Sequence, residues 1–201
     1  MQINKLTLKI VSKFINISRS FISKYLAIIG SRISRGIVIW PSSTSTTIPV
    51  RIDGPGTVVL GQNVRLGYRP APRMGNGAIL LQARIKGSKI VVGEGTTISN
   101  NTSIVAMNSV IIGCNCLIGD RVSIVDCDFH ESTPEFRRNS SGKIKPVDIG
   151  NNVWIGSQVM ILKGVSIGDN TVVGAMSLVT KSFPSNCIVA GNPAKIIKHF
   201  E

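Results

Sequence analysis

Residues 149–181 read IGNNVWIGSQVMILKGVSIGDNTVVGAMSLVTK, and an aliphatic residue returns at every sixth position of this stretch. The series consists of Ile149, Ile155, Ile161, Ile167, Val173 and Val179. Two shorter series with the same step lie upstream, and they consist of Val92, Ile98 and Ile104, then Ile112, Ile118 and Ile124. Such unbroken runs indicate a true six-residue repeat, and a repeat has to be recognised before any other fold signal is weighed.

Two further positions of the repeat indicate the kind of coil. Glycine follows the aliphatic residue repeatedly, where a tight corner needs a residue without a Cβ; it does so at Gly93, Gly113, Gly119, Gly150, Gly156, Gly168 and Gly174. The position four residues after the aliphatic one is small or β-branched, which suits short strands. A β-sandwich would not keep a fixed register for so long. The pattern therefore predicts an all-β solenoid, a parallel β-helix over residues 41–190, with a weaker form of the repeat in residues 57–91.

Residues 57–198 resemble the hexapeptide-repeat acyltransferases, and residues 149–198 are similar to the closing coils of the maltose, galactoside and surface-polysaccharide O-acetyltransferases. The resemblance implies a left-handed β-helix, a homotrimer with sites between subunits, and transfer of acetyl from acetyl-CoA to a carbohydrate hydroxyl. A γ-class carbonic anhydrase would need three histidine ligands for zinc, whereas this chain has two histidines. The β-helix nucleotidyltransferases carry a Gly-rich nucleotide-binding domain, for which this chain has no loop and no room.

The repeat stops at VSIVDCDFHESTPEFRRNSSGKIKPVDIG, residues 122–150. A further step of six from Ile124 reaches His130, and residues 131–146 are then expected to leave the coil as a protruding loop, a common place for a binding site in solenoids. In extended chain Asp126, Asp128 and His130 share one face, so a carboxylate could orient the imidazole. The resemblance implies that His130 is the general base. The shared face makes Asp126 or Asp128 the expected partner of its imidazole. The alternative is that His130 only caps the loop.

A zinc site is the other interpretation of this region. Its ligands would be Cys114, Cys116, Cys127 and His130. The Cys-x-Cys spacing is shorter than that of ordinary structural zinc sites, and the repeat already accounts for Cys116, so no metal is expected.

The resemblance also implies contacts for the donor, and one for the acceptor at Asn101. Its donor contacts are Ser157, Ala175, Thr180, Lys181, Lys195 and Lys198. Lys195 and Lys198 are three residues apart, which would place both on one side of a short C-terminal helix within a tail of residues 191–201. On the acceptor side the expected contacts are Trp154, which could stack on a sugar ring or simply pack under the loop, and Asn101.

Composition limits the remaining possibilities. The chain has 201 residues and a net charge of +13, and its length suits one domain. Its four cysteines are scattered, which favours reduced thiols in the cytoplasm. Basic residues without acids fill residues 1–35, and an apolar residue recurs there at three- and four-residue steps. This predicts an amphipathic helical extension, residues 1–40, that either caps the solenoid or rests on an anionic membrane at its cytoplasmic face.

Three rival functions are compatible with this composition and repeat. The chain could be an N-acyltransferase for an amino sugar, an antibiotic acetyltransferase, or a non-catalytic membrane-binding β-helix. Nucleic acid is not expected as a partner, because the lysines are not interleaved with aromatic residues.

Overall fold

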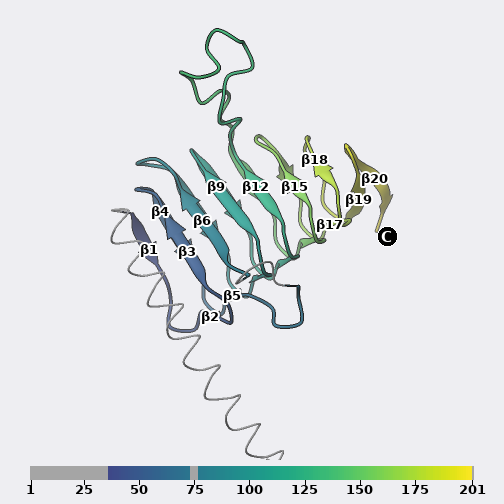
Figure 1. Cartoon of the computed structure of the whole chain (residues 1–201). Coiled ribbons are helices and arrows are strands. Elements are labelled where there is room, and N and C mark those ends of the chain that lie inside the picture. The colour runs from purple at the N-terminus through teal and green to yellow at the C-terminus, as the bar shows by residue number, and fades with distance from the viewer. Residues whose placement is uncertain (1–35, 73–76, 201) are drawn as a thin grey trace, which may run out of the picture.

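The fold is known from a computed structural model, which describes residues 36–72 and 77–200. Up to Val179 the chain winds through three parallel sheets in strict rotation, so that every third strand returns to the same sheet (Figure 1). Sheet A contains β1 (Ile37–Ile39), β4 (Thr57–Leu60), β7 (Lys89–Val92), β10 (Ser109–Ile112), β13 (Val147–Ile149) and β16 (Ser166–Ile167). Sheet B contains β2 (Ser45–Thr46), β5 (Arg65–Leu66), β8 (Thr97–Ile98), β11 (Leu117–Ile118), β14 (Trp154–Ile155), β17 (Val172–Val173), β19 (Cys187–Gly191) and β20 (Ala194–His199). Sheet C contains β3 (Val50–Asp53), β6 (Ile79–Ala83), β9 (Ser103–Ala106), β12 (Ser123–Val125), β15 (Met160–Ile161) and β18 (Leu178–Val179).

The six-residue repeat forms the core of this prism. Ile149, Ile155 and Ile161 end strands of sheets A, B and C in turn, and each is at most 3% exposed. The side chain two residues before each isoleucine also points inward, as at Val153 and Val159, which are both 1% exposed. Each coil therefore buries two small or branched side chains per sheet, and stacking the coils joins them into one aliphatic core. The predicted parallel β-helix is confirmed.

Two long connections leave the prism at different edges. Residues 67–78, of which 67–72 and 77–78 are described, join β5 to β6 where sheet B meets sheet C, which we call the BC edge. Residues 126–146 join β12 to β13 and depart where sheet C meets sheet A, the CA edge. Figure 1 shows the second connection as the green loop that stands clear of the stack. The expected protruding loop at residues 131–146 is its outer part.

The prediction of a short C-terminal helix is wrong. Residues 194–199 form β20, which pairs antiparallel with β19. The last coil leaves an open strand edge with unpaired backbone groups, and the neighbouring Ile196 and Ile197 favour a strand that covers it. The register shifts by one residue between Ile188 and Val189, where a bulge is accommodated.

The N-terminal extension is described only at its end. Residues 1–35, for which an amphipathic helix was expected, lie outside the described residues. Strand β1 pairs with β4, so the β-helix already includes residues 37–39, and the predicted boundary of the extension at residue 40 lies too late in the chain. Among the described residues there is no helix with the length and apolar character needed to cross a membrane.

Candidate active site

His130 is carried on a short two-stranded stalk that rises from the CA edge. The two sides of the stalk are joined by backbone hydrogen bonds from Lys145 N to Asp126 O (2.9 Å) and from Asp128 N to Lys143 O (3.1 Å). Between them Cys127 and Ile144 form an antiparallel bridge. The side chain of His130 emerges at the top of this stalk and is exposed.

The hydrogen bond of His130 defines which ring nitrogen could act as a base. Its Nδ1 lies 3.0 Å from the carbonyl oxygen of Arg137, in the same loop. A carbonyl oxygen only accepts, so Nδ1 carries the proton and donates it. In the neutral ring Nε2 then has a free lone pair, which is the arrangement that a general base requires.

The two aspartates make other contacts. Asp126 is fully buried, and its carboxylate accepts hydrogen bonds from the backbone of Met107 (2.8 Å) and Asn108 (2.6 Å) in the preceding coil. Asp128 forms an ion pair with Lys163, which belongs to the following coil. Among the described residues neither carboxylate hydrogen-bonds His130, and the Arg137 carbonyl takes the place expected for an aspartate. Each aspartate instead ties the base of the stalk to a neighbouring coil.

The backbone just before His130 is strained. Phe129 has a φ of 64°, in the left-handed region that a large side chain avoids. The guanidinium of Arg84, which follows β6 two coils earlier, lies 5.0 Å from the centre of the Phe129 ring and holds it by a cation–π contact. Sequence spacing did not indicate Arg84, Arg137 or Lys163, because all three reach the site only through the folded loop or the stacked coils.

Burial and hydrogen bonding shift the pKa of two groups near His130. Burial raises the pKa of the Cys127 thiol, which keeps it a neutral member of the stalk. Hydrogen bonds from Ser132 hold the pKa of Glu131 below its ordinary value.

A shallow pocket of about 360 Å³ lies beside the imidazole and is bordered by Arg84, Phe129 and Arg138. Within the described ranges no three histidine, cysteine or acidic side chains gather as metal ligands.

The residues expected to contact the donor and acceptor lie mostly on the outer face of sheet B and at the BC edge. Trp154 pairs in register with Leu117 on one side and with Val172 on the other, and its side chain is exposed. Val172 pairs with Ile188, and Ile188 pairs with Lys198 of β20. Because directly paired residues share a face, Trp154 and Lys198 belong to one outer column, separated by three strand spacings or about 14 Å.

The bulge in the last strand pair decides where the two C-terminal lysines point. Lys195 pairs with Ala190 and Lys198 pairs with Ile188, two residues apart in β19, so both lysines face outward. The spacing of Lys195 and Lys198 predicts that they lie on one side of a helix. They do share a side, but a bulged strand provides it.

Ser157 and Ala175 lie on successive coils at the BC edge, beside this column. With Trp154 they line a pocket of about 380 Å³. Gly156 makes this close stacking possible, because a Cβ there would lie 2.6 Å from the backbone nitrogen of Ala175.

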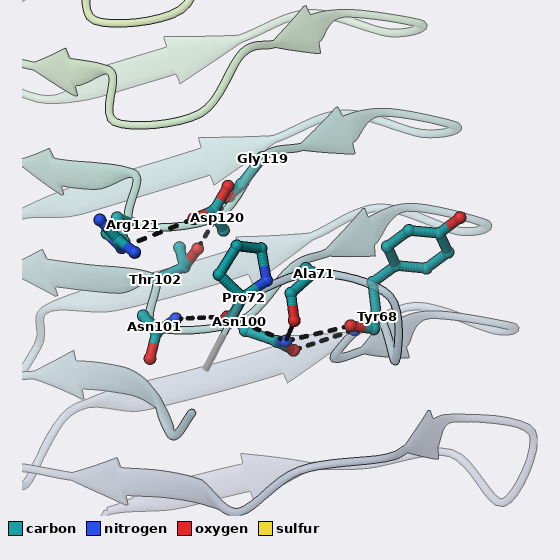
Figure 2. A network of polar contacts seen from close by, with 9 residues as sticks. All are labelled: Tyr68, Ala71, Pro72, Asn100, Asn101, Thr102, Gly119, Asp120 and Arg121. Carbon is teal, nitrogen blue, oxygen red and sulfur yellow. Dashed lines mark hydrogen bonds and ion pairs between the residues drawn. The ribbon is translucent and has the colours of Figure 1, made fainter. Parts of the chain in front are cut away.

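Asn101, also at the BC edge, donates from its side-chain amide to the Pro72 carbonyl (2.9 Å) and so contacts the connection of residues 67–78 (Figure 2).

The expected site residues thus fall into two groups within one chain. His130, Thr180 and Lys181 lie at the CA edge, whereas the acceptor contacts and the remaining donor contacts lie at the BC edge or on sheet B. The strands of sheet C separate the two edges. A single chain therefore does not bring His130 together with Trp154 or Ser157.

The chain was compared with known proteins. Residues 146–181 match the family described as bacterial transferase hexapeptide (six repeats). The chain is 34% identical, over 161 residues that make up 76% of it and 76% of the relative, to the Escherichia coli K12 protein named for O-acetyl transfer in lipopolysaccharide biosynthesis. Galactoside O-acetyltransferase of the same organism is 44% identical over 112 residues, 56% of this chain and 55% of the relative. Among solved structures, a galactoside acetyltransferase in complex with coenzyme A has a TM-score of 0.52 and 26% identity, over 92% of this chain and 82% of that one.

These matches show the family. The chain belongs to the hexapeptide-repeat acetyltransferases, and the expected class of left-handed parallel β-helix is confirmed. The chain spans little more than half the length of several curated relatives that it matches.

Proposed function

We propose that this protein is an acetyl-CoA-dependent O-acetyltransferase that modifies a carbohydrate hydroxyl of a surface polysaccharide or its precursor. The observation that carries the proposal is the free Nε2 of His130, presented on a stalk at the break of an acetyltransferase repeat. The four cysteines are free thiols, which suits a reducing compartment such as the cytoplasm, where we place the enzyme.

In the proposed reaction His130 Nε2 removes the proton from the acceptor hydroxyl. The oxygen forms a bond to the carbonyl carbon of the thioester, the carbon–sulfur bond breaks, and the imidazolium returns its proton to the departing thiolate. The Arg137 carbonyl supports this cycle by holding Nδ1–H and by stabilising the positive charge that His130 carries between the two transfers.

The donor fits the outer face of sheet B. Lys198, in the same column as Trp154, and the neighbouring Lys195 would meet the phosphates of coenzyme A at the end of the solenoid. The pantetheine arm would follow the column for about 14 Å to Trp154 and Ser157. Thr180 and Lys181, at the other edge, would reach the same donor from a second subunit.

Two copies of the chain are needed for this site. The CA edge of one subunit supplies His130, and the BC edge of its neighbour supplies the donor groove. A closed ring of three such contacts gives the homotrimer that the family resemblance implies.

Substitution of His130 tests the proposal. His130→Asn keeps a donor near the place of Nδ1, and so keeps the bond to Arg137, but removes the base. We expect turnover to fall by about 10²–10⁴-fold with an unchanged KM for acetyl-CoA. His199→Ala, which removes the other histidine at the far end of the molecule, is the matched control. Near-normal turnover of His130→Asn would refute the assignment.

The assay follows thiol release from acetyl-CoA with methyl β-galactoside, maltose and lipopolysaccharide oligosaccharides as acceptors, and mass spectrometry locates the acetyl group. Glucosamine and chloramphenicol in the same panel test the rival activities, and acetylation of an amine in place of a hydroxyl would favour the N-acyltransferase.

A further inference from the structure

The connection of residues 67–78 is anchored at its start by one buried side chain. Asn100 is 0% exposed, and its Oδ1 accepts a hydrogen bond from Tyr68 N (3.1 Å). Its Nδ2 lies within hydrogen-bonding distance of the carbonyl oxygens of Tyr68 (3.0 Å) and Ala71 (2.9 Å), and more distantly of Pro72 (3.3 Å). Figure 2 shows the Asn100 amide directed at this backbone while the ring of Tyr68 points away from the network.

The anchored segment forms one wall of a pocket of about 540 Å³ on sheet B. Three of the side chains that line it are large, apolar and half exposed: Tyr68 (56%), Leu117 (54%) and Trp154 (56%). Leu117 and Trp154 are neighbours in register on the outer face. Polar groups share the lining, among them Asp120 and Arg65.

This lining suits a sugar ring. A pyranose has an apolar C–H face, which packs on aromatic rings, and a rim of hydroxyls, which hydrogen-bond to carboxylate and guanidinium groups. Small-ligand sites combine apolar walls with a few convergent polar groups in the same way.

The pocket continues into the proposed donor groove. It shares Gly119, Trp154 and Ser157 with the smaller pocket that also contains Ala175. A sugar against Tyr68 would therefore lie directly beyond the thioester end of the donor, on the side away from Lys195 and Lys198.

We infer that residues 67–72 form the acceptor wall of the site, an inference that rests on the proposed function. In this wall Tyr68 is a specificity-determining residue that stacks on the acceptor sugar. Asn100 is the residue that positions Tyr68. The wall arises within a chain's own BC edge, so each subunit carries the acceptor wall and the donor groove together.

Steady-state kinetics with the acceptor that supports transfer best test the role of Tyr68. Tyr68→Ala is expected to raise the KM for that acceptor about tenfold, leaving the KM for acetyl-CoA unchanged. Tyr68→Phe keeps the ring face and should stay within about twofold of the wild type. Ile37→Ala, which removes an exposed side chain (61%) from sheet A, is the matched control. An increased KM for acetyl-CoA, or no change in either constant, would overturn the inference.

Asn100→Asp tests the positioning role. It keeps the acceptor for Tyr68 N but replaces the donor by an oxygen that faces three carbonyls, so the segment must move. The KM for the acceptor should then rise as in Tyr68→Ala, with kcat and the KM for acetyl-CoA retained. A variant that instead lost kcat alone would show that Asn100 does not act through Tyr68.

A binding measurement separates this inference from the proposed reaction. In a Trp40→Phe background, Trp154 is the single tryptophan, and titration with the acceptor sugars in the presence of coenzyme A should change its fluorescence. The change should require Tyr68. Because no turnover is needed, a saturable signal that Tyr68→Ala abolishes would support the pocket even if wild-type enzyme transferred no acetyl group, whereas a signal that persists in Tyr68→Ala would overturn it.

Discussion

Gly142 lies on the returning side of the stalk, where the chain passes close to the His130 backbone. Its φ is 66°, and a Cβ at this position would lie 2.3 Å from the His130 carbonyl oxygen. The residue therefore serves two needs, a left-handed backbone and a close approach that leaves no room for a side chain.

Gly142→Ala is expected to push the His130 backbone aside and to lower kcat at least tenfold, with little change in the KM for acetyl-CoA, because the base is displaced while the donor groove is intact. Gly87→Ala is a sharp control, since Gly87 has a φ of 88° but nothing within 4 Å of the added carbon. Equal kinetic losses in both variants would show that backbone strain, rather than displacement of His130, is responsible.

Glycine and asparagine have different roles at the corners of the coils. Gly113 has no room for a Cβ, which would lie 2.5 Å from the Gly150 carbonyl oxygen of the next coil. The left-handed conformations fall nearby on asparagines, with φ of 52° at Asn152 and 59° at Asn170. Asn152 Nδ2 donates to Asn170 Oδ1 (2.9 Å), so the corners of successive coils are also bonded to each other. The six-residue repeat predicted the role of the glycines at the corners. It did not predict that asparagines adopt the left-handed conformations and join successive coils.

At the scale of elements, Asp126 connects the stalk to the preceding coil. Its buried carboxylate receives two backbone N–H groups from residues 107 and 108, at the corner where β9 gives way to β10. Hydrogen bonds to a charged acceptor are worth about 1.5–3 kcal/mol, more than those between neutral groups.

Asp126→Asn is therefore expected to lower the free energy of unfolding by about 1.5–3 kcal/mol, because one oxygen becomes an NH₂ that faces a donor. Asp128→Asn, which loses a partly exposed ion pair with Lys163, should cost less than about 1 kcal/mol. Urea unfolding at equal protomer concentrations measures both. If Asp126→Asn kept full stability and lost only turnover, the original hypothesis that Asp126 orients His130 would be favoured again.

For the whole molecule, the separation of the CA and BC edges predicts complementation between defective subunits. His130→Ala removes the base at one edge, and Ala175→Trp fills the donor groove at the other, so each variant alone should be inactive. Coexpressed in equal amounts, the two should recover roughly a quarter of the wild-type activity, because a quarter of the interfaces then join two intact edges.

Light scattering on the same preparation should give the mass of a trimer. Two differently tagged His130→Ala chains, mixed in the same way, should remain inactive and serve as the control. A mixed assembly without activity, or a fully active monomer, would refute the shared site.

The sequence alone determined the solenoid, because the spacing between inward-facing residues is a local property of the chain. A step of six places Ile155 and Ile161 in the core whatever lies beyond them, and the loss of that step at His130 located the stalk. Residues 149–181 therefore identified the fold and, through resemblance, the family.

Only the tertiary structure decided the partners of these residues. The Arg137 carbonyl reaches His130 through the fold of an irregular loop, and Lys163 reaches Asp128 from the next coil. The spacing of Lys195 and Lys198 matched a helix, but the open edge of β19 required a strand. In each case stacking or loop closure brought together groups that are distant or irregularly spaced in sequence, and a six-residue period contains no information about such contacts.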